Sequence, residues 1–384
     1  MKLLIVGAGG YGGTNLKALF ANAYPNEVIE GVVDPFIEGC AYKEQIRAAG
    51  IPVYDTMEEF YREHSADLAV ISTPTFLHCE QSIAALENGS YVLCEKPAAP
   101  TCEQVEKMIE AEKKYGRFLA IGFQWSFSDA IQALKRDALD GKLGKPVLLR
   151  TMIQWPRNRA YYARGGGWGG CIQRGGVPVN DSIAANACAH YLHNMLFVLG
   201  GSMEESAMPD HTEAECLRAN AIENFDTCAI RMHFDATGAD ALFVASHATE
   251  ITRNPEFVYT FTDAEVTYSR DEGSQIVAHF KDGTTKNYGD PFCETHGVKK
   301  LSDCIACVEN GTRPVCSVST AYPHASVIDR LQQHIDIVDF PQVCENREEN
   351  RVYVEGLSET MKRVYEHASS FAQEGYDFAR KVSF

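Results

Sequence analysis

The sequence has too few basic residues to balance its acidic ones. Lys and Arg number 35 against 52 Asp and Glu, so the formal net charge is −17 at pH 7. We therefore expect neither a nucleic-acid partner nor an anionic membrane surface, because both require a basic field on the protein. The sequence also lacks any run that approaches the ~20 uninterrupted apolar residues of a membrane span.

A secretory leader and a complete zinc pattern are missing as well. The chain opens on MKLLIVG, which is typical of a strand that turns at glycine, so we expect no signal peptide and a cytoplasmic protein whose 13 cysteines are reduced. Cys304 and Cys307 have the C-x-x-C spacing of a zinc or redox site, but no second pair follows at zinc-finger distance. Because LSDCIACVENG is typical of a helix that ends at Gly311, we predict core packing there and no metal, with a metal site as the alternative.

The 384 residues are more than a single core supports, so about two domains are expected. The first 123 residues alternate between apolar strand-like runs and helix-like segments. The strand-like runs cover 2–7, 28–34, 52–54, 68–73, 91–96 and 118–123, and the helix-like segments include 56–64 and 101–115. Asp55 followed by Glu58 resembles a capping box, while Thr101 and Gly116 are suited to begin and end the second helix. This alternation predicts a parallel sheet with helices on both faces.

A glycine pattern follows the first strand directly. GAGGYGG has the spacing G-x-G-x-x-G at Gly7, Gly9 and Gly12, and Asp34 ends the second strand 22 residues beyond Gly12. In a dinucleotide fingerprint such glycines allow a tight turn, close approach of the backbone to the pyrophosphate, and close packing of helix on strand. A carboxylate at Asp34 accepts hydrogen bonds from the adenosine ribose and repels a 2′-phosphate, and no arginine follows it. We therefore predict NAD as the cofactor, with NADP as the less favoured alternative.

The fifth strand ends in CEKP (94–97), where a parallel sheet binds its ligands. With GAGGYG, STPTFLH (72–78), GFQW (122–125) and a histidine-bearing helix after residue 180, this motif resembles the Gfo/Idh/MocA family of glucose–fructose oxidoreductase and inositol dehydrogenase relatives. The resemblance implies an NAD(P)-dependent dehydrogenase or reductase acting on CH–OH groups, in which Lys96 contacts the reacting sugar hydroxyl. Desolvation or a nearby positive nicotinamide would lower the pKa of this lysine toward ~7–8, where it can shuttle a proton.

The expected cofactor contacts come from these motifs. They are Gly7, Gly9, Gly10, Tyr11, Gly12, Asp34, Thr73, Pro74, His78, Glu95, Lys96 and Gln124. Thr73, Pro74 and His78 resemble the family segment beside the nicotinamide. His78 could equally cap the helix that follows it.

After residue 123 the regular alternation stops. A helix is predicted at 128–140 and strands with period-2 patterns are predicted at 147–155, 241–249, 256–269 and 276–289, with a helix near 350–372. Asp282-Gly283 in the last of these runs is a strong hairpin signal. We predict a Rossmann α/β domain with a doubly wound parallel sheet over 1–123, and an α+β domain with a large, mostly antiparallel open sheet over 124–384. The resemblance implies that the open sheet joins subunits into a homo-oligomer, a dimer or a tetramer.

Residues 155–176 are rich in glycine, aromatics and arginine. We interpret them as a mobile loop that closes over a sugar, because aromatic faces pack on sugar C–H surfaces and guanidinium groups bind hydroxyls. A plain surface loop is the alternative. The expected substrate contacts in this stretch are Trp155, Arg157, Tyr162 and Trp168.

NDSIAANACAHYLHNMLFVLG (180–200) is predicted to form an apolar helix with Asn186, His190 and His193 on one stripe, because they recur at i, i+4 and i+7. The resemblance implies a helix carrying D-x-x-x-H-x-x-D, whose first aspartate and histidine face the substrate. Alignment on the histidine gives His190 that role and places Asn186 at the aspartate, whereas counting from Gly175-Gly176 makes Asp181 the aspartate. The expected catalytic residues are therefore Lys96, His190, Asn186 and Asp181, and the expected substrate contacts include Lys96, Asn186, His190 and His193. His193 could instead orient its neighbours without touching substrate.

Together these residues predict an NAD(H)-dependent oxidoreductase that transfers hydride between nicotinamide and a hydroxyl or carbonyl carbon of a sugar, inositol or related polyol. Lys96 and His190 would exchange the hydroxyl proton. Two alternatives are an NAD-dependent glycosidase, which oxidises the sugar transiently and eliminates the aglycone, and a non-catalytic dinucleotide-binding regulator. Net formation of NADH separates the oxidoreductase from the glycosidase.

Overall fold

The computed structural model describes residues 1–21, 23–292 and 296–384. By its contacts the chain divides into two compact units: Met1–Ser128 with Phe292–Tyr322, and Asp129–Pro291 with Pro323–Phe384. The first unit is therefore discontinuous in sequence. The prediction of domains over 1–123 and 124–384 stays a prediction, and the contacts add that a segment around residue 300 packs with the N-terminal residues.

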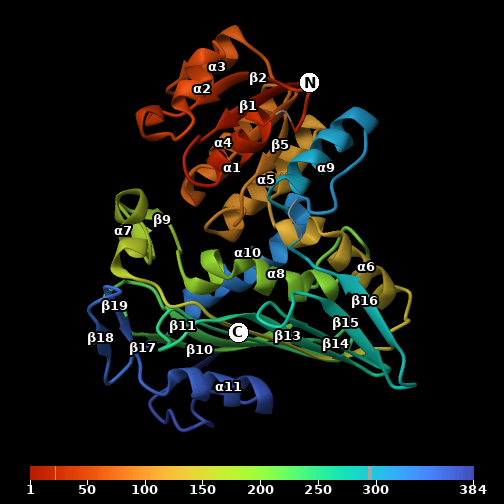
Figure 1. The fold of residues 1–384 in the computed structure, drawn as a ribbon, viewed down its shortest axis with the longest axis vertical. Coiled ribbons are helices and arrows are strands. Elements are labelled where there is room, and N and C mark those ends of the chain that lie inside the picture. The colour runs from red at the N-terminus through yellow and green to blue at the C-terminus, as the bar shows by residue number, and fades with distance from the viewer. Residues whose placement is uncertain (22, 293–295) are drawn as a thin grey trace. The chain divides into compact units, whose positions relative to one another are not determined.

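The first unit is built on a six-stranded, all-parallel sheet in the order β3-β2-β1-β4-β5-β6 (Figure 1). Its strands are β1 (Lys2–Val6), β2 (Val28–Val33), β3 (Val53–Tyr54), β4 (Leu68–Ile71), β5 (Tyr91–Cys94) and β6 (Leu119–Ile121). Each of the six predicted runs contains one of these strands, and the order is that of a dinucleotide-binding doubly wound sheet. The strands are almost continuously apolar because both faces of the sheet are buried.

The helices of the first unit flank this sheet (Figure 1). They are α1 (Gly12–Phe20), α2 (Lys43–Ala48), α3 (Met57–Glu63), α4 (His78–Glu87), α5 (Cys102–Tyr115) and α9 (His296–Asn310), with single 3-10 turns at η1 (Ile37–Gly39), η2 (Thr75–Leu77) and η3 (Gln124–Phe127). α4 packs on α5, and α9 packs on α1, η3 and β5. As predicted, α9 ends just before Gly311, and within it Cys304 is fully buried.

Two predicted helix ends can be compared with the observed caps. Thr101 begins α5 by accepting a hydrogen bond from the Gln104 N–H (3.4 Å), and Gly116 ends it in a left-handed conformation, as predicted. The predicted capping box at Asp55 and Glu58 is wrong by one residue. Thr56 and Glu59 form the box instead, because each side chain accepts a hydrogen bond from the other residue's N–H.

The second unit is built on a ten-stranded sheet whose main path runs β16-β15-β14-β13-β7-β12-β11-β10-β17, with β20 also pairing β10. Its strands are β7 (Pro146–Gln154), β10 (His211–Arg218), β11 (Thr227–Phe234), β12 (Ala239–Ser246), β13 (Arg253–Phe261), β14 (Ala264–Ser269), β15 (Ile276–Phe280), β16 (Thr285–Gly289), β17 (Ile337–Asp339) and β20 (Lys381–Ser383). Only the pairs β12–β7 and β10–β17 are parallel, which confirms the prediction of a mostly antiparallel sheet. The predicted turn between β15 and β16 is present, with Gly283 at φ 87°.

Helices cover both faces of this second sheet. The helices of this unit are α6 (Asp129–Leu139), α7 (Arg159–Gly167), α8 (Ala189–Val198), α10 (Val318–His334), whose first residues belong to the first unit, and α11 (Leu357–His367). A small hairpin of β18 (Cys344–Asn346) and β19 (Arg351–Tyr353) precedes α11. α8 lies on one face and α11 on the other (Figure 1). α11 packs its apolar side on β7 and β12, so it covers part of the sheet that was predicted to join subunits. Among the described residues, no helix is both long and apolar enough to cross a membrane.

The glycine-rich stretch 155–176, predicted to be a loop, contains regular secondary structure, and its closing over a sugar stays a prediction. It contains α7 and leads into a tight hairpin of β8 (Gln173–Arg174) and β9 (Val177–Pro178). Asn158 caps α7, because its Oδ1 accepts a hydrogen bond from the Tyr161 N–H (3.0 Å). Gly166 and Gly167 then adopt left-handed conformations at the end of the helix.

The prediction of a single helix over 180–200 is wrong. A π-helical turn, η4 (Ile183–Ala187), is followed by a break at Cys188 and then by α8. Ser182 begins the turn by accepting a hydrogen bond from the Ala185 N–H (3.1 Å). Because a π turn holds more residues than an α turn, Asn186 and His190 do not share the predicted i, i+4 stripe of one helix.

Candidate functional site

The glycine turn joins β1 to α1 in the first unit. Gly7 has φ 83° and donates its N–H to Val33 O (2.9 Å), which ties the turn to β2. A Cβ at Gly12 would lie 1.9 Å from Gly7 O, so helix and turn pack as closely as only glycine permits. A Cβ at Gly9 or Gly10 would meet open space. No described side chain caps α1, although the Gly12 and Thr14 N–H groups donate to Gly9 O and Tyr11 O. The N-terminal end of the helix and the space beside Gly9 and Gly10 fit a pyrophosphate.

Alanine at two of these glycines is expected to separate folding from cofactor binding. Gly12→Ala forces a Cβ onto backbone and should cost about 1–3 kcal/mol of stability, measured by urea denaturation. Gly9→Ala meets no protein atom, so stability should stay within about 0.5 kcal/mol while NAD affinity falls at least tenfold, measured by calorimetric titration. Unchanged NAD affinity in Gly9→Ala would contradict the placement of the pyrophosphate.

Asp34 is held rigidly at the carboxyl end of β2. Its Oδ2 accepts the Ala8 N–H and its Oδ1 accepts the Phe36 N–H, each at 2.8 Å. These bonds fix the carboxylate beside the glycine turn. Its negative charge there favours a ribose with free hydroxyls over a 2′-phosphate.

His78 links two of the predicted motifs. It is the first residue of α4 and is 1% exposed, with its Nε2 2.9 Å from Thr73 O and its Nδ1 2.9 Å from Pro97 O. The N-cap position of α4 is Leu77, and both ring nitrogens of His78 face carbonyl oxygens outside the helix. The ring therefore ties the segment of Thr73 and Pro74 to the loop that follows Lys96.

A buried ion pair supports the E-K-P motif from behind. Glu95 (7% exposed) pairs with Lys300 of α9, which is fully buried. The Lys300 ammonium lies 4.0 Å from the centroid of the Tyr11 ring, and the Tyr11 hydroxyl donates to Gln124 Oε1 (3.3 Å). Burial alone would lower the pKa of Lys300, but the Glu95 carboxylate and the Tyr11 hydroxyl raise it above its ordinary value, so the Lys300 side chain stays an ammonium.

This cluster contains three predicted cofactor residues and Lys300, which the sequence did not indicate. Tyr11, Glu95 and Gln124 come from three separate motifs, and Lys300 comes from α9, a helix for which the sequence predicted no cofactor contact. Gly122 of the GFQW motif makes room for the pair, since a Cβ there would lie 2.9 Å from Lys300 Nζ. Lys96 is partly buried and is the second residue after β5, next to Glu95.

In the second unit, Asp181 and Asn186, the two alternatives for the family aspartate, lie in contact with each other. Asp181 (6% exposed) accepts a hydrogen bond from Asn186 Nδ2 (2.8 Å) and from the Gly170 N–H (2.6 Å), and it forms an ion pair with Arg164 (3.1 Å). The carboxylate of Asp181 is therefore already engaged, and the Asn186 amide is oriented by it. The catalytic roles of both residues stay predictions.

Aromatic rings and arginines of the 155–168 stretch form a second cluster in this unit. The Arg157 guanidinium lies 4.9 Å from the Tyr161 ring centroid and 5.5 Å from that of Trp155. Arg164 stacks on Tyr161 (3.8 Å) and Trp168 (4.4 Å). The predicted contacts Trp155, Arg157 and Trp168 thus share one neighbourhood, and Arg164 is an addition to them.

His247 belongs to this cluster and was not predicted. It follows β12, is 2% exposed, and its Nδ1 lies 3.2 Å from the Tyr162 hydroxyl. The Tyr161 ring packs edge-on against it, with centroids 5.3 Å apart. The only sequence signal was a histidine directly after an apolar strand, in FVASHAT, and that signal is weak.

The two predicted histidines of α8 differ in their surroundings. His190 is partly exposed, whereas His193 is fully buried and stacks on Phe197 with centroids 6.0 Å apart. Burial, together with the nearby His324 and Lys135, holds the pKa of His193 well below its ordinary value. Contact of either residue with substrate stays a prediction.

Buried neutral histidines should make stability fall as the pH drops. Burial holds the pKa of His193 and of His247 well below 6.5, so below that pH the unfolded chain binds protons that the folded chain does not. The free energy of unfolding should then decrease from pH 6.5 downward, by up to about 1.4 kcal/mol per pH unit for each histidine, until the folded-state pKa is reached.

Urea denaturation between pH 7.5 and 5 tests this expectation. His193→Gln should lose one histidine's share of the slope, whereas His279→Gln, which replaces an exposed histidine, should keep it. Comparing slopes cancels the contribution of other titrating groups. Identical slopes in wild type and His193→Gln would show that His193 does not resist protonation.

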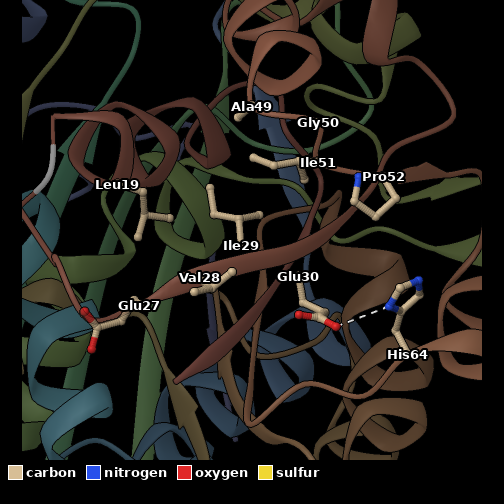
Figure 2. Close-up of a pocket in the computed structure, with 10 residues that line it drawn as sticks. All are labelled: Leu19, Glu27, Val28, Ile29, Glu30, Ala49, Gly50, Ile51, Pro52 and His64. Atoms are coloured by element: carbon tan, nitrogen blue, oxygen red, sulfur yellow. Dashed lines mark hydrogen bonds and ion pairs between the residues drawn. The ribbon is translucent and has the colours of Figure 1, made fainter.

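A cavity of about 520 Å³ lies at the other end of β2 from Asp34 (Figure 2). Its lining includes Val28 and Glu30 at the start of β2 and Gly50, Ile51 and Pro52 before β3. Figure 2 shows the Glu30 carboxylate facing His64, at 3.2 Å. Because ligands of doubly wound sheets bind beyond the carboxyl ends of the strands, this cavity lies outside the candidate site.

Comparison with known proteins agrees with this geometry. Residues 1–123 match the Gfo/Idh/MocA oxidoreductase family, described as an NAD-binding Rossmann fold. The chain is 28% identical over 169 residues to the rhizopine catabolism protein MocA of Rhizobium meliloti, a match covering 43% of this chain and 51% of that protein. It is 30% identical over 155 residues to the inositol 2-dehydrogenase of Rubrobacter xylanophilus, covering 40% and 43% respectively. The chain thus spans about half the length of the curated relatives it matches.

A solved structure extends the likeness in fold to most of the chain. The WlbA dehydrogenase from Bordetella pertussis, in complex with NADH and UDP-GlcNAcA, superposes with a TM-score of 0.70 at 18% identity, over 86% of this chain and 95% of that one. That likeness shows the fold of both units. Residues 1–123 are thus similar to the NAD-binding Rossmann fold of the Gfo/Idh/MocA oxidoreductase family, and most of the chain shares the fold of a solved dehydrogenase structure.

Proposed function

We propose that this protein is an NAD(H)-dependent oxidoreductase that transfers hydride between nicotinamide and a hydroxyl or carbonyl carbon of a sugar, inositol or related polyol. The observation that carries the proposal is the position of Lys96. It follows β5, whose carboxyl end lies on the same edge of the parallel sheet as the glycine turn after β1 and Asp34 after β2. A cofactor and a reacting hydroxyl meet at that edge in doubly wound sheets.

The chain's own residues are proposed to bind, orient and exchange a proton. NAD, when bound, supplies the hydride acceptor. Lys96 and His190 are proposed to exchange the proton of the substrate hydroxyl, and an ammonium must lose its proton readily to do so. Asn186, oriented by Asp181, is proposed as a hydrogen-bond partner of the substrate.

We further propose that NAD is preferred over NADP. Asp34 presents a carboxylate fixed by two backbone N–H groups, and the residues directly after it are Pro35, Phe36 and Ile37, none of which can neutralise a 2′-phosphate. A phosphate there would meet uncompensated negative charge. The ratio of kcat/KM for the two cofactors measures this preference.

A screen of sugars and polyols with NAD and with NADP, followed at 340 nm, tests the function. Turnover with accumulation of NADH, at higher kcat/KM with NAD, is the expected result. Release of an aglycone without NADH would instead indicate the redox-assisted glycosidase. Tight NAD binding with no reaction in either direction would indicate a regulator.

We propose that the protein forms a homo-oligomer in the cytoplasm. Along β13 and β14 fully buried residues alternate with less buried ones, as in an antiparallel sheet with one face not fully covered. The described cysteines are all free thiols, which suits a reducing compartment. Light scattering coupled to size-exclusion chromatography measures the number of subunits, and a monomer at micromolar concentration would contradict the proposal.

A further inference from the structure

We propose that the substrate carries an anionic group, a carboxylate or a phosphate, and that Arg157 and His247 bind it. This inference rests on the proposed function, because it narrows the substrate class of the same oxidoreductase. It comes from the second unit alone. Two nitrogen atoms there, on residues that lie side by side, lack the partners that their burial requires.

Arg157 is a guanidinium without a counter-charge. None of the ion pairs among the described residues includes it, and its Nε is buried with no hydrogen-bond partner. Its guanidinium lies over the faces of Trp155 and Tyr161, which attract a cation but do not neutralise it. A partly buried arginine in this state has its hydrogen-bonding fork available for a planar or tetrahedral anion.

Arg164 provides a comparison within the same cluster. It also stacks on Tyr161, at 3.8 Å, but it forms an ion pair with Asp181. The other buried carboxylate nearby, Asp226, accepts hydrogen bonds from the N–H groups of residues 219 and 220, from the Asn220 side chain and from the Thr227 hydroxyl. Both acids are therefore engaged elsewhere, and neither balances Arg157.

His247 supplies the second nitrogen. The backbone N–H of Arg157 donates a hydrogen bond to the backbone oxygen of His247 (3.0 Å), which holds the two residues side by side. His247 is 2% exposed, and its Nε2 has no hydrogen-bond partner. Burial, with the Arg157 and Arg164 charges, holds the pKa of His247 well below its ordinary value, so the ring is neutral.

In the proposed site the hydroxyl of Tyr162 sets which nitrogen of that neutral ring carries the proton. Burial raises the pKa of Tyr162, so its hydroxyl keeps its hydrogen, and we assign it as the donor to His247 Nδ1, 3.2 Å away. The ring proton then sits on Nε2, which becomes a donor. An anionic oxygen would accept from this N–H and from Arg157 together, and it would supply the charge that the guanidinium lacks.

Ligand titration followed by tryptophan fluorescence tests the proposal, because Trp155 lies against Arg157. The probes are D-glucuronate and D-glucose 6-phosphate, with D-glucose as the neutral parent, and myo-inositol 1-phosphate with myo-inositol. At least one anionic probe should bind ten or more times more tightly than its parent. The glucuronate and phosphate arms show which anion the site takes.

Variants of Arg157 test whether this residue causes the preference for anionic probes. Arg157→Met should reduce the affinity for the anionic probe at least tenfold and leave the neutral parent unchanged, while Arg157→Lys should keep part of the preference. Arg380→Met, which removes an exposed arginine paired with Asp336, is the control and should bind like wild type. Equal binding of anionic and neutral probes by the wild type, or a preference that survives in Arg157→Met, would overturn the proposal.

Failure of the anion-site proposal can be distinguished from failure of the proposed oxidoreductase function. Turnover of neutral polyols with NADH formation and no anion preference would leave the oxidoreductase intact and remove the anion site. Anion binding that depends on Arg157, without NADH formation from any probe, would support the anion site and contradict the oxidoreductase.

Discussion

Lys96→Met is expected to lower kcat/KM by about two to four orders of magnitude at pH 7, the usual contribution of a general acid or base. Methionine nearly matches lysine in length but can neither hold nor release a proton. Because Lys96 is only partly buried at the end of β5, the thermal midpoint should change little. Initial rates with the best substrate from the sugar screen measure the effect.

A second substitution separates proton transfer from charge. Lys96→Arg keeps the positive charge but cannot deprotonate, so it should be almost as inactive as Lys96→Met. Lys107→Met, on the exposed face of α5, removes a lysine paired only with Glu103 and should keep full activity. Activity of Lys96→Arg close to wild type would show that Lys96 supplies charge and moves no proton.

Lys300→Met is expected to destabilise the protein by about 3–5 kcal/mol, because it leaves the Glu95 carboxylate buried without its counter-charge. The Tyr11 ring would also lose the ammonium that it contacts at 4.0 Å. Urea denaturation measures the loss. Lys299→Met is a matched control on the same helix, since its partner Asp303 is four residues on and partly exposed, and it should cost less than about 1 kcal/mol.

The double variant Glu95→Gln with Lys300→Met tests the cause. Removing both charges should recover most of the stability that Lys300→Met loses, because no buried charge is then left unpaired. A double variant as unstable as Lys300→Met would attribute the loss to packing of the lysine stem. NAD affinity is the second measurement, since Tyr11 and Glu95 are both predicted cofactor contacts.

The fold of the first 123 residues followed from sequence because its signals are local. Apolar runs, N-cap residues and the glycine turn each act within a few positions, and the six strands were all found. The capping box shows the limit of such signals, since Asp55 with Glu58 and Thr56 with Glu59 fit the same spacing. The return of α9 to the first unit had no local signal, because its packing partners are far away in sequence.

In the candidate site, too, the residues with local sequence signals were predicted and those that depend on distant partners were not. Residues in motifs, such as Asp34 and Lys96, were named from sequence. Arg164, His247 and Lys300 were not, because each acts through a partner that only the tertiary structure brings near. The π turn before α8 was missed for a related reason: a helical stripe assumes a constant number of residues per turn, and η4 changes it.

The pairing of Glu95 with Lys300 also has a consequence for synthesis in the cell. The two residues are 205 positions apart, which a ribosome covers in about 10–40 seconds at ~5–20 residues per second. During that interval the nascent N-terminal segment contains Glu95 but not yet Lys300, so burial of the Glu95 carboxylate would leave it without a counter-ion. The Rossmann sheet can emerge first but reach its full stability only after most of the second unit has been translated. A premature stop before α9 should therefore yield a product that cellular proteases remove.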